Sequence, residues 1–215
     1  KVFAKFGIKA IQLGETDSKL GGVETHNDAR KCAELFRKHA GEIDGVLVVL
    51  PNFGDEKGVA DTLKMSKLNV PVLIQGYPDD LKQLSPARRR DAFCGKISVT
   101  NNLVQAGIKF SLTSKHVSHP SSASFEVDLQ KFLGVCRVVN GVRGVRLGAV
   151  GARPGAFNTV RYSEKILERH GISVTTVDLS EIIGKANKLD ASAPSVVSKL
   201  KEITGYAPAP GVPQD

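Results

Sequence analysis

Polar side chains follow the predicted strands at three places in the sequence, and open parallel sheets bind their ligands where strands end. The first place is the segment 51–56, which comes directly after an apolar run. Asp55 and Glu56 suit the first turn of a helix, because the helix dipole stabilises negative charge there. Asn52 and Phe53 are not explained by helix capping, so we take them as candidates for ligand contact.

The second place is the segment 93–102, which we predict to be a loop that leads into a helix. Lys96, Asn101 and Asn102 offer hydrogen bonds that suit sugar hydroxyl groups; alternatively, they cap the helix and are solvated. Cys94 has no evident base beside it, which favours a small buried thiol over a nucleophile. The segment therefore indicates binding rather than covalent catalysis.

The third place is the glycine-rich segment 151–159, between a predicted strand and a predicted helix. Anions collect on the free backbone N–H groups of such a junction. Asp178, at the end of the next predicted strand, resembles the ribose-binding acid of dinucleotide folds. However, the glycine spacing departs from G-x-G-x-x-G, and Asp178 also fits a capping box with Glu181. A dinucleotide site is therefore an alternative and not the leading hypothesis.

Metal-binding and nucleophilic patterns are weak in this sequence. His116 and His119 could supply two metal ligands, but no carboxylate lies near them in sequence, and the Ser/Pro flanks favour solvated loop histidines. The three cysteines are far apart and show no zinc-ligand or disulfide spacing. No nucleophile elbow or phosphate-binding P-loop motif is present.

Helical and strand patterns alternate along the whole chain, which predicts parallel sheets with helices on both faces. We expect two Rossmann-like (flavodoxin-like) α/β domains: 1–122, which lacks its initial strand and helix, and 123–206, a bridging helix followed by part of a central domain. Residues 207–215 read as a linker. The expected strands are 8–13, 45–50, 70–75, 108–112, 145–150 and 172–178. The expected helices are 1–6 (the last turn of a helix), 25–39, 55–66, 98–105, 125–139, 158–170, a helix that begins at 178, and 193–204.

Composition narrows the possible partners. The net charge of +8 and pI near 9.4 invite a nucleic-acid interpretation, but the basic residues are mostly scattered and no aromatic pattern interleaves with them. A mildly basic surface also suits an enzyme that handles anionic or polyhydroxy substrates. No apolar run approaches membrane-spanning length, and the first residues have no signal-peptide pattern. We expect no nucleic-acid or membrane partner and a cytoplasmic location.

Four stretches of the sequence resemble one known family. They are GVLVVLPNFGDEKGVADTL (45–63), NVPVLIQGYPDD (69–80), RRRDAFCGKISVTNNL (88–103) and GARPGAFNTVRYSEKIL (151–167). In this order they resemble the L-fucose isomerase-like branch of the L-fucose/L-arabinose isomerase family, over the N-terminal half of such enzymes.

This resemblance implies aldose–ketose interconversion assisted by a divalent metal, usually Mn²⁺, which polarises the substrate oxygens while a carboxylate moves the proton. In the family the metal ligands lie later in the chain, so we expect no metal ligand and no catalytic residue among these 215 residues.

The resemblance also implies a homo-oligomer, a trimer or hexamer, in which the first domain faces the active site of a neighbouring subunit. Asn52, Phe53 and Asn101 would then contact the sugar substrate in trans. The arabinose isomerases carry a substrate-contacting histidine roughly where Asn101 stands, so this sequence departs from their pattern at that position. Arg153 and Asn158 are the candidates in the second domain.

Two functions from other classes remain open at this point. One is a sugar-binding or regulatory α/β module without catalysis, and the other is an NAD(P)-binding oxidoreductase domain with its phosphate site at 151–158. The leading expectation is a fragment of a metal-dependent ketol isomerase that contributes walls of the substrate pocket and subunit contacts.

Overall fold

The computed structural model describes residues 2–208 and 210–211, and contacts divide the chain into two units, Lys1–Gly141 and Val142–Asp215. Each unit is α/β with parallel strands, as predicted. No helix in the described part of the chain is both long and apolar enough to cross a membrane.

The first unit is built on a parallel sheet with the order β1-β2-β3. All five residues of the central strand β2 are buried, including the polar Gln75, because parallel sheets are covered on both faces. The register pairs Val46 with Val72 and Leu73 with Ser111. The strands are β1 (Val46–Leu50), β2 (Val72–Gly76) and β3 (Ser111–Leu112).

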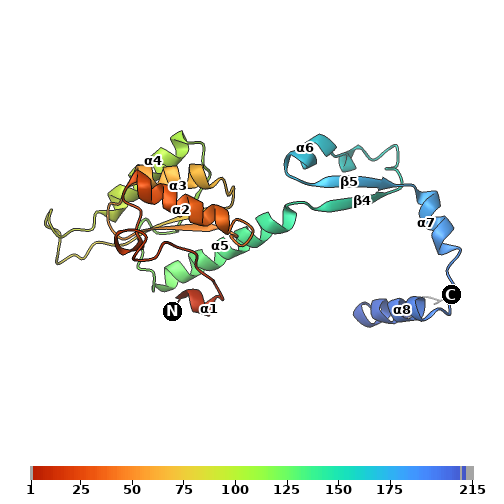
Figure 1. Ribbon diagram of the computed structural model, residues 1–215. Helices are drawn as coiled ribbons and strands as arrows, with labels where there is room; N and C mark the ends of the chain where they lie inside the picture. Colours follow the sequence, from red (N-terminus) through yellow and green to blue (C-terminus); the bar gives the residue numbers. More distant parts are fainter. Residues whose placement is uncertain (1, 209, 212–215) are drawn as a thin grey trace. The chain divides into compact units, whose positions relative to one another are not determined.

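Helices cover both faces of this sheet (Figure 1). One face carries α2 (His26–Lys38), α3 (Glu56–Ser66) and α4 (Ala92–Gln105), and the other carries α1 (Val2–Lys5) and α5 (Ala123–Val142). The buried face of α5 repeats at helical spacing, as predicted for this segment, and packs on Leu73 of β2. Its members are Phe125, Leu129, Phe132 and Cys136.

Local signals explain where these helices begin. Thr25 caps α2 and Asp28 completes a capping box: the Asp28 N–H donates to Thr25 Oγ1 over 3.2 Å, and the Thr25 N–H donates to Asp28 Oδ2 over 3.0 Å. Asp55 caps α3 by accepting a hydrogen bond of 2.7 Å from the Gly58 N–H. The helix starts predicted at 25 and 55 are confirmed.

One predicted strand is wrong. Residues 8–13 belong to no sheet, and only Leu13 of this segment is buried. The N–H of Ile8 donates to the carbonyl of Phe3 over 2.9 Å, which makes a local turn instead of a ladder. Alternating apolar residues predicted a strand here, but a strand needs a neighbour with free backbone groups, and this segment pairs with none.

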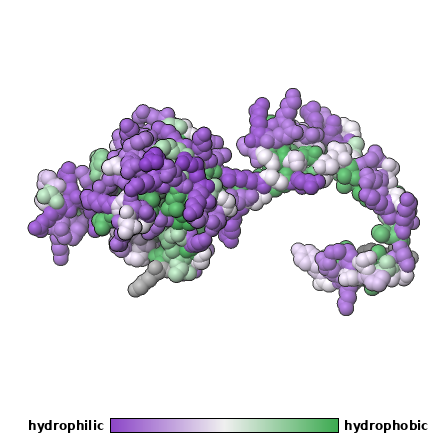
Figure 2. All heavy atoms as spheres, in the orientation of Figure 1, coloured by the Kyte–Doolittle hydropathy of each residue, from purple (hydrophilic) through white to green (hydrophobic). Residues whose placement is uncertain are grey.

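The second unit contains the parallel pair β4 (Arg146–Val150) and β5 (Ser173–Val177), with the short helix η2 (Asn158–Val160) and helices α6 (Glu164–Arg169), α7 (Leu179–Ala186) and α8 (Pro194–Tyr206). No residue of this unit within the described part of the chain is buried. Figure 2 shows hydrophobic residues open to view on it; Leu147 and Val150 of β4 are 44% and 57% exposed. Two strands cannot cover their own apolar faces.

Two predictions in this unit need correction. The predicted helix 158–170 divides into η2 and α6, so a continuous α-helix begins only at Glu164. Asp178 caps α7 by accepting from the Ser180 N–H over 2.8 Å, but the predicted capping box does not form, because Glu181 instead accepts from Lys185 Nζ over 2.6 Å.

Candidate functional site

The loops that follow β1, β2 and β3 meet at one edge of the first unit's sheet, since the strands are parallel and their carboxyl ends share that edge. These loops span 51–55, 77–91 and 113–122. We call this region the carboxyl edge. Its side chains come from all three loops and from the first turns of α4, which starts at the end of the 77–91 loop.

The loop after β1 presents the two residues singled out in the sequence. Asn52 and Phe53 are both exposed, Phe53 to 41%. The backbone of Phe53 lies directly on α4 at Gly95: a Cβ added to Gly95 would come within 1.9 Å of the Phe53 carbonyl oxygen. Only glycine permits this approach. The backbone of this loop is therefore fixed against α4, while the side chains of Asn52 and Phe53 remain accessible.

Arg90 ties the loop after β2 to the loop after β1. Its guanidinium donates to the Pro51 carbonyl over 3.0 Å and lies 5.2 Å from the centre of the Tyr77 ring, a cation–π contact. Asp79 Oδ1 accepts from the backbone N–H groups of Arg90 and Asp91 over 2.6 and 3.0 Å, and so closes the neck of the long loop. Both ends of the 77–91 segment are thereby fixed at the carboxyl edge.

Lys96 supports the loop after β3 from beneath. It is only 4% exposed, and its ammonium donates to Thr113 Oγ1 over 2.7 Å and to the His116 carbonyl over 2.9 Å. Burial lowers the pKa of Lys96, and the charge of Asp128 partly opposes that shift. The structure therefore places Lys96 at the carboxyl edge with its hydrogen bonds already directed to protein groups.

Aromatic and imidazole rings line the same edge. The rings of Phe93 and His116 lie 5.1 Å apart, and those of Tyr77 and His119 lie 5.4 Å apart in an edge-to-face arrangement. Together with Phe53 they form what we call the aromatic rim. Small-molecule sites characteristically combine such apolar walls with a few polar groups, which Asn52 and the imidazoles supply here.

The other predicted site residues lie elsewhere. Residues 93–102 form the body of α4 and not a loop, so Asn101 lies about 12 Å along the helix axis from Phe93. The Asn101 side chain accepts from Gln105 Nε2 over 2.5 Å on the exposed face of the helix. Cys94, predicted as a buried thiol, is exposed in the first turn of α4. The structure therefore brings Asn52, Phe53 and Lys96 to one edge but leaves Asn101 apart.

Arg153 and Asn158 belong to the second unit, in the loop that follows β4 and at the start of η2. Arg153 Nη1 donates to the carbonyls of Pro154, Gly155 and Phe157 over 3.2, 3.2 and 3.3 Å, so it braces its own loop. This glycine-rich loop leads into η2 rather than into an α-helix, and the Asp178 carboxylate is occupied by capping α7. Both findings weaken the dinucleotide alternative, which needs a helix N-terminus and a free acid.

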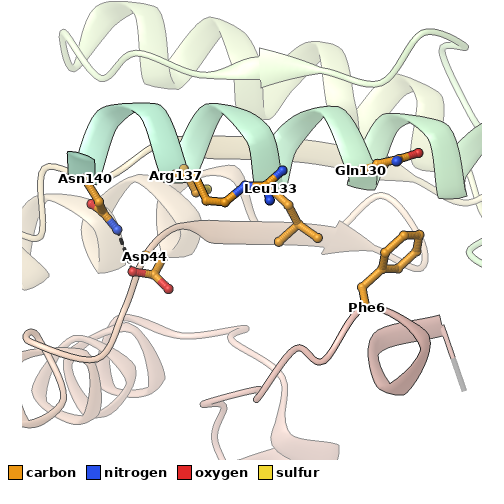
Figure 3. Close-up of a pocket in the computed structure, with 7 residues that line it drawn as sticks. Phe6, Asp44, Gln130, Leu133, Arg137 and Asn140 are labelled. Atoms are coloured by element: carbon orange, nitrogen blue, oxygen red, sulfur yellow. Dashed lines mark hydrogen bonds between the residues drawn. The ribbon is translucent and has the colours of Figure 1, made fainter. Parts of the chain in front are cut away.

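A hollow of about 530 Å³ lies beside α5 (Figure 3). Asn140 Nδ2 donates to Asp44 Oδ1 over 2.5 Å at one end, and Phe6 lies at the other end. Cys136 lines this hollow, but burial and the charge of Asp44 raise the pKa of its thiol, so it is protonated at neutral pH. Asp44 precedes β1, and the hollow therefore does not belong to the carboxyl edge.

Sequence reasoning missed Tyr77, Arg90 and Phe93, and it treated His116 and His119 only as metal ligands or solvated residues. The signal was available: Tyr77 directly follows β2 and both histidines follow β3, so the strand-end rule that selected Asn52 also covers them.

No group of three or more His, Cys, Asp or Glu side chains among the residues that the structure describes is placed to hold a metal ion. The described residues therefore do not fit a divalent-metal site.

Comparison with known proteins supplies the family. No curated protein matches the chain. Residues 1–143 match the family model for the N-terminal domain of fucose/sulfoquinovose isomerases, a range that includes the whole carboxyl edge. The chain therefore belongs to the fucose/sulfoquinovose isomerase family, and its residues 1–143 correspond to the N-terminal domain of that family.

Proposed function

We propose that this chain forms walls of the sugar pocket in a divalent-metal-dependent aldose–ketose isomerase. The observation that carries the proposal is the family match over 1–143, since it covers every residue of the carboxyl edge. The match favours this function over the two alternatives, a non-catalytic sugar-binding module and a nicotinamide-dependent oxidoreductase. Neither alternative has an observation of its own in its favour.

In this proposal the carboxyl edge binds and orients the sugar. The amide of Asn52 is exposed and can both donate to and accept from hydroxyl groups. The aromatic rim covers the less polar face of the sugar and excludes water from it. Lys96 acts through the loop that it supports, because its ammonium is committed to Thr113 and the His116 carbonyl. Asn101, Arg153 and Asn158 stay secondary candidates for substrate contact.

Metal, assembly and location are further parts of the proposal. Mn²⁺ is the expected cation, and its ligands lie outside the residues described. The carboxyl edge would face the active site of a neighbouring subunit in a trimer or hexamer. The expected location is the cytoplasm.

A direct test measures aldose–ketose conversion by the protein expressed from its complete gene, over a panel of pentoses, hexoses and 6-deoxyhexoses. We expect that a chelator abolishes conversion and that added Mn²⁺ restores it. Conversion that is indifferent to the chelator would refute the metal dependence, and no conversion of any sugar would refute the isomerase assignment.

A further inference from the structure

Gln75 is a polar residue buried in the central strand β2. It is 0% exposed, and the two residues before it in the strand, Leu73 and Ile74, are apolar and also buried. A buried polar side chain costs free energy unless hydrogen bonds within the protein replace those that it made with water. The hydrogen bonds of Gln75 therefore indicate its role.

Among the described residues, the Gln75 side chain is bonded only to the loop after β3. Gln75 Nε2 donates to the Ser118 carbonyl over 2.6 Å, and Gln75 Oε1 has no partner in the part of the chain that the structure describes. The Ser118 N–H donates to the Gly76 carbonyl over 3.0 Å, so both backbone groups of Ser118 are bonded to the end of β2. Because an unpartnered buried oxygen opposes folding, stability alone does not account for a glutamine at this place.

The bond from Gln75 fixes the backbone directly before His119. Ser118 and His119 are adjacent in the chain, and the imidazole of His119 contacts the Tyr77 ring edge to face at 5.4 Å. Gln75 thus holds His119 through the backbone, and Tyr77 holds it through the ring. Both contacts keep His119 at the carboxyl edge.

The ring of His119 is fixed in its tautomer as well. The Ser121 N–H donates to His119 Nδ1 over 3.2 Å, and Ser121 Oγ lies 2.7 Å from the same nitrogen. A backbone N–H can only donate, so Nδ1 accepts and the proton of the neutral ring is on Nε2. The imidazole is exposed, and its Nε2 makes no hydrogen bond with the described residues. His119 therefore offers an N–H donor at the carboxyl edge.

We propose that His119 donates a hydrogen bond from Nε2 to a hydroxyl oxygen of the sugar, and that Gln75 is the residue that positions His119 for this contact. A hydroxyl oxygen has two lone pairs and accepts from such a donor. The inference rests on the proposed function, because it takes the ligand of the carboxyl edge to be a sugar. The hold of Gln75 on the loop stands on the hydrogen bonds alone.

The first measurement concerns the loop and needs no sugar. Amide hydrogen exchange of the whole protein is followed by mass spectrometry in the peptide that contains Ser118. Methionine is unbranched like glutamine but has no N–H donor, so Gln75→Met should speed this exchange about fivefold or more. If Gln75→Met does not fold, Gln75→Leu is the second variant, with the same expected result.

Thr62→Val is the matched control for the loss of a buried hydrogen bond. Thr62 is 6% exposed, and its Oγ1 donates within α3 to the Gly58 carbonyl over 2.8 Å. The variant removes this bond far from the loop after β3 in the hydrogen-bond network. It should therefore leave the exchange at Ser118 and the KM of the sugar unchanged.

The second measurement is the steady-state kinetics of the protein expressed from its complete gene. His119→Leu should raise the KM of the sugar about tenfold, and His119→Gln, which also ends in an Nε2–H donor, should recover most of this loss. Gln75→Met should raise the KM with a smaller change in kcat, because it displaces the donor without removing it. Once His119→Leu is present, adding Gln75→Met should raise the KM no further, because Gln75 acts through His119.

Three results overturn the inference: a wild-type KM in His119→Leu, additive losses in the double variant, or an exchange rate at Ser118 that Gln75→Met does not change. If any of these occurs in a protein that converts sugars, the proposed function stands and the roles of His119 and Gln75 fall. Faster exchange in Gln75→Met, in a protein that converts no sugar, supports the hold on the loop and refutes the proposed function.

Discussion

At Gly95 the helix α4 and the loop after β1 approach too closely for a residue with a Cβ atom. In most exposed helical positions Gly→Ala stabilises a protein, because alanine loses less backbone freedom on folding. At Gly95 the added Cβ would meet the Phe53 carbonyl oxygen at 1.9 Å and the Phe53 Cα at 2.7 Å, both backbone atoms. Ordinary contact begins near 3.4 Å, so the loop after β1 and α4 must separate by about 1.5 Å.

The energy follows from two opposing effects. Overpacking against a backbone that cannot rotate away costs up to about 3 kcal/mol, and the helix propensity of alanine returns about 1 kcal/mol. We therefore expect Gly95→Ala to lower the free energy of unfolding by about 2 kcal/mol, measured by urea denaturation followed by circular dichroism. Because the same shift displaces the Phe53 loop, the variant should also raise the KM of any sugar substrate.

Gly134 provides the control. It lies in α5, and a Cβ added there would meet nothing within 4 Å. Gly134→Ala should therefore raise the free energy of unfolding by about 0.5–1 kcal/mol. A Gly95→Ala protein as stable as the wild type, or more stable, would refute the close packing of the loop on α4.

Three further predictions concern the first unit: the helix cap Thr25, the carboxylate of Asp28 and the reactivity of the cysteines. Thr25→Ala removes the cap of α2 and should lower the free energy of unfolding by about 1 kcal/mol, whereas Thr25→Ser should retain most of it. The hydrogen bonds from Thr25 lower the pKa of Asp28 below its ordinary 3.8. The Asp28 carboxylate therefore stabilises the fold above pH 3.8, and this stabilisation is lost as the pH falls through the lowered pKa. If the urea midpoint of Asp28→Asn changed with acid as steeply as that of the wild type, this prediction would be contradicted. Native protein should react with a thiol reagent at Cys94 alone, because burial raises the pKa of Cys32 to about 11 and that of Cys136 also rises, and all three should react in denaturant; rapid native labelling of Cys32 would contradict the packing of α2.

The first unit was largely predictable because its signals are local and strong. The apolar run 46–50, the capping residues Thr25 and Asp55, and the heptad-like face from Phe125 to Cys136 each specify one element with little dependence on the rest. These are the elements whose predicted positions the structure confirms.

The failures share a physical cause, which is that the deciding partner is distant in sequence. Residues 8–13 alternate like a strand but have no neighbouring strand to pair with. In the sequence Lys96 is a plausible ligand-binding group, but in the folded chain its ammonium donates hydrogen bonds to the loop after β3. Whether a polar side chain faces solvent or its own protein is decided by tertiary contacts.

The candidate site was half predictable for the same reason. Asn52 and Phe53 follow from the strand-end rule applied to β1. The roles of Arg90 and Tyr77 depend on a contact between two loops: Arg90 crosses from the loop after β2 to the Pro51 carbonyl after β1. No spacing within the sequence encodes that contact.

The central claim is that the carboxyl edge of the first unit contacts the sugar, and steady-state kinetics of Asn52→Ala tests it most directly. The matched control is Gln130→Ala, which alters the hollow beside α5. We expect Asn52→Ala to raise the KM about tenfold or more with a smaller change in kcat, and Gln130→Ala to change neither. An unchanged KM in Asn52→Ala, or the same rise in both variants, would contradict the account.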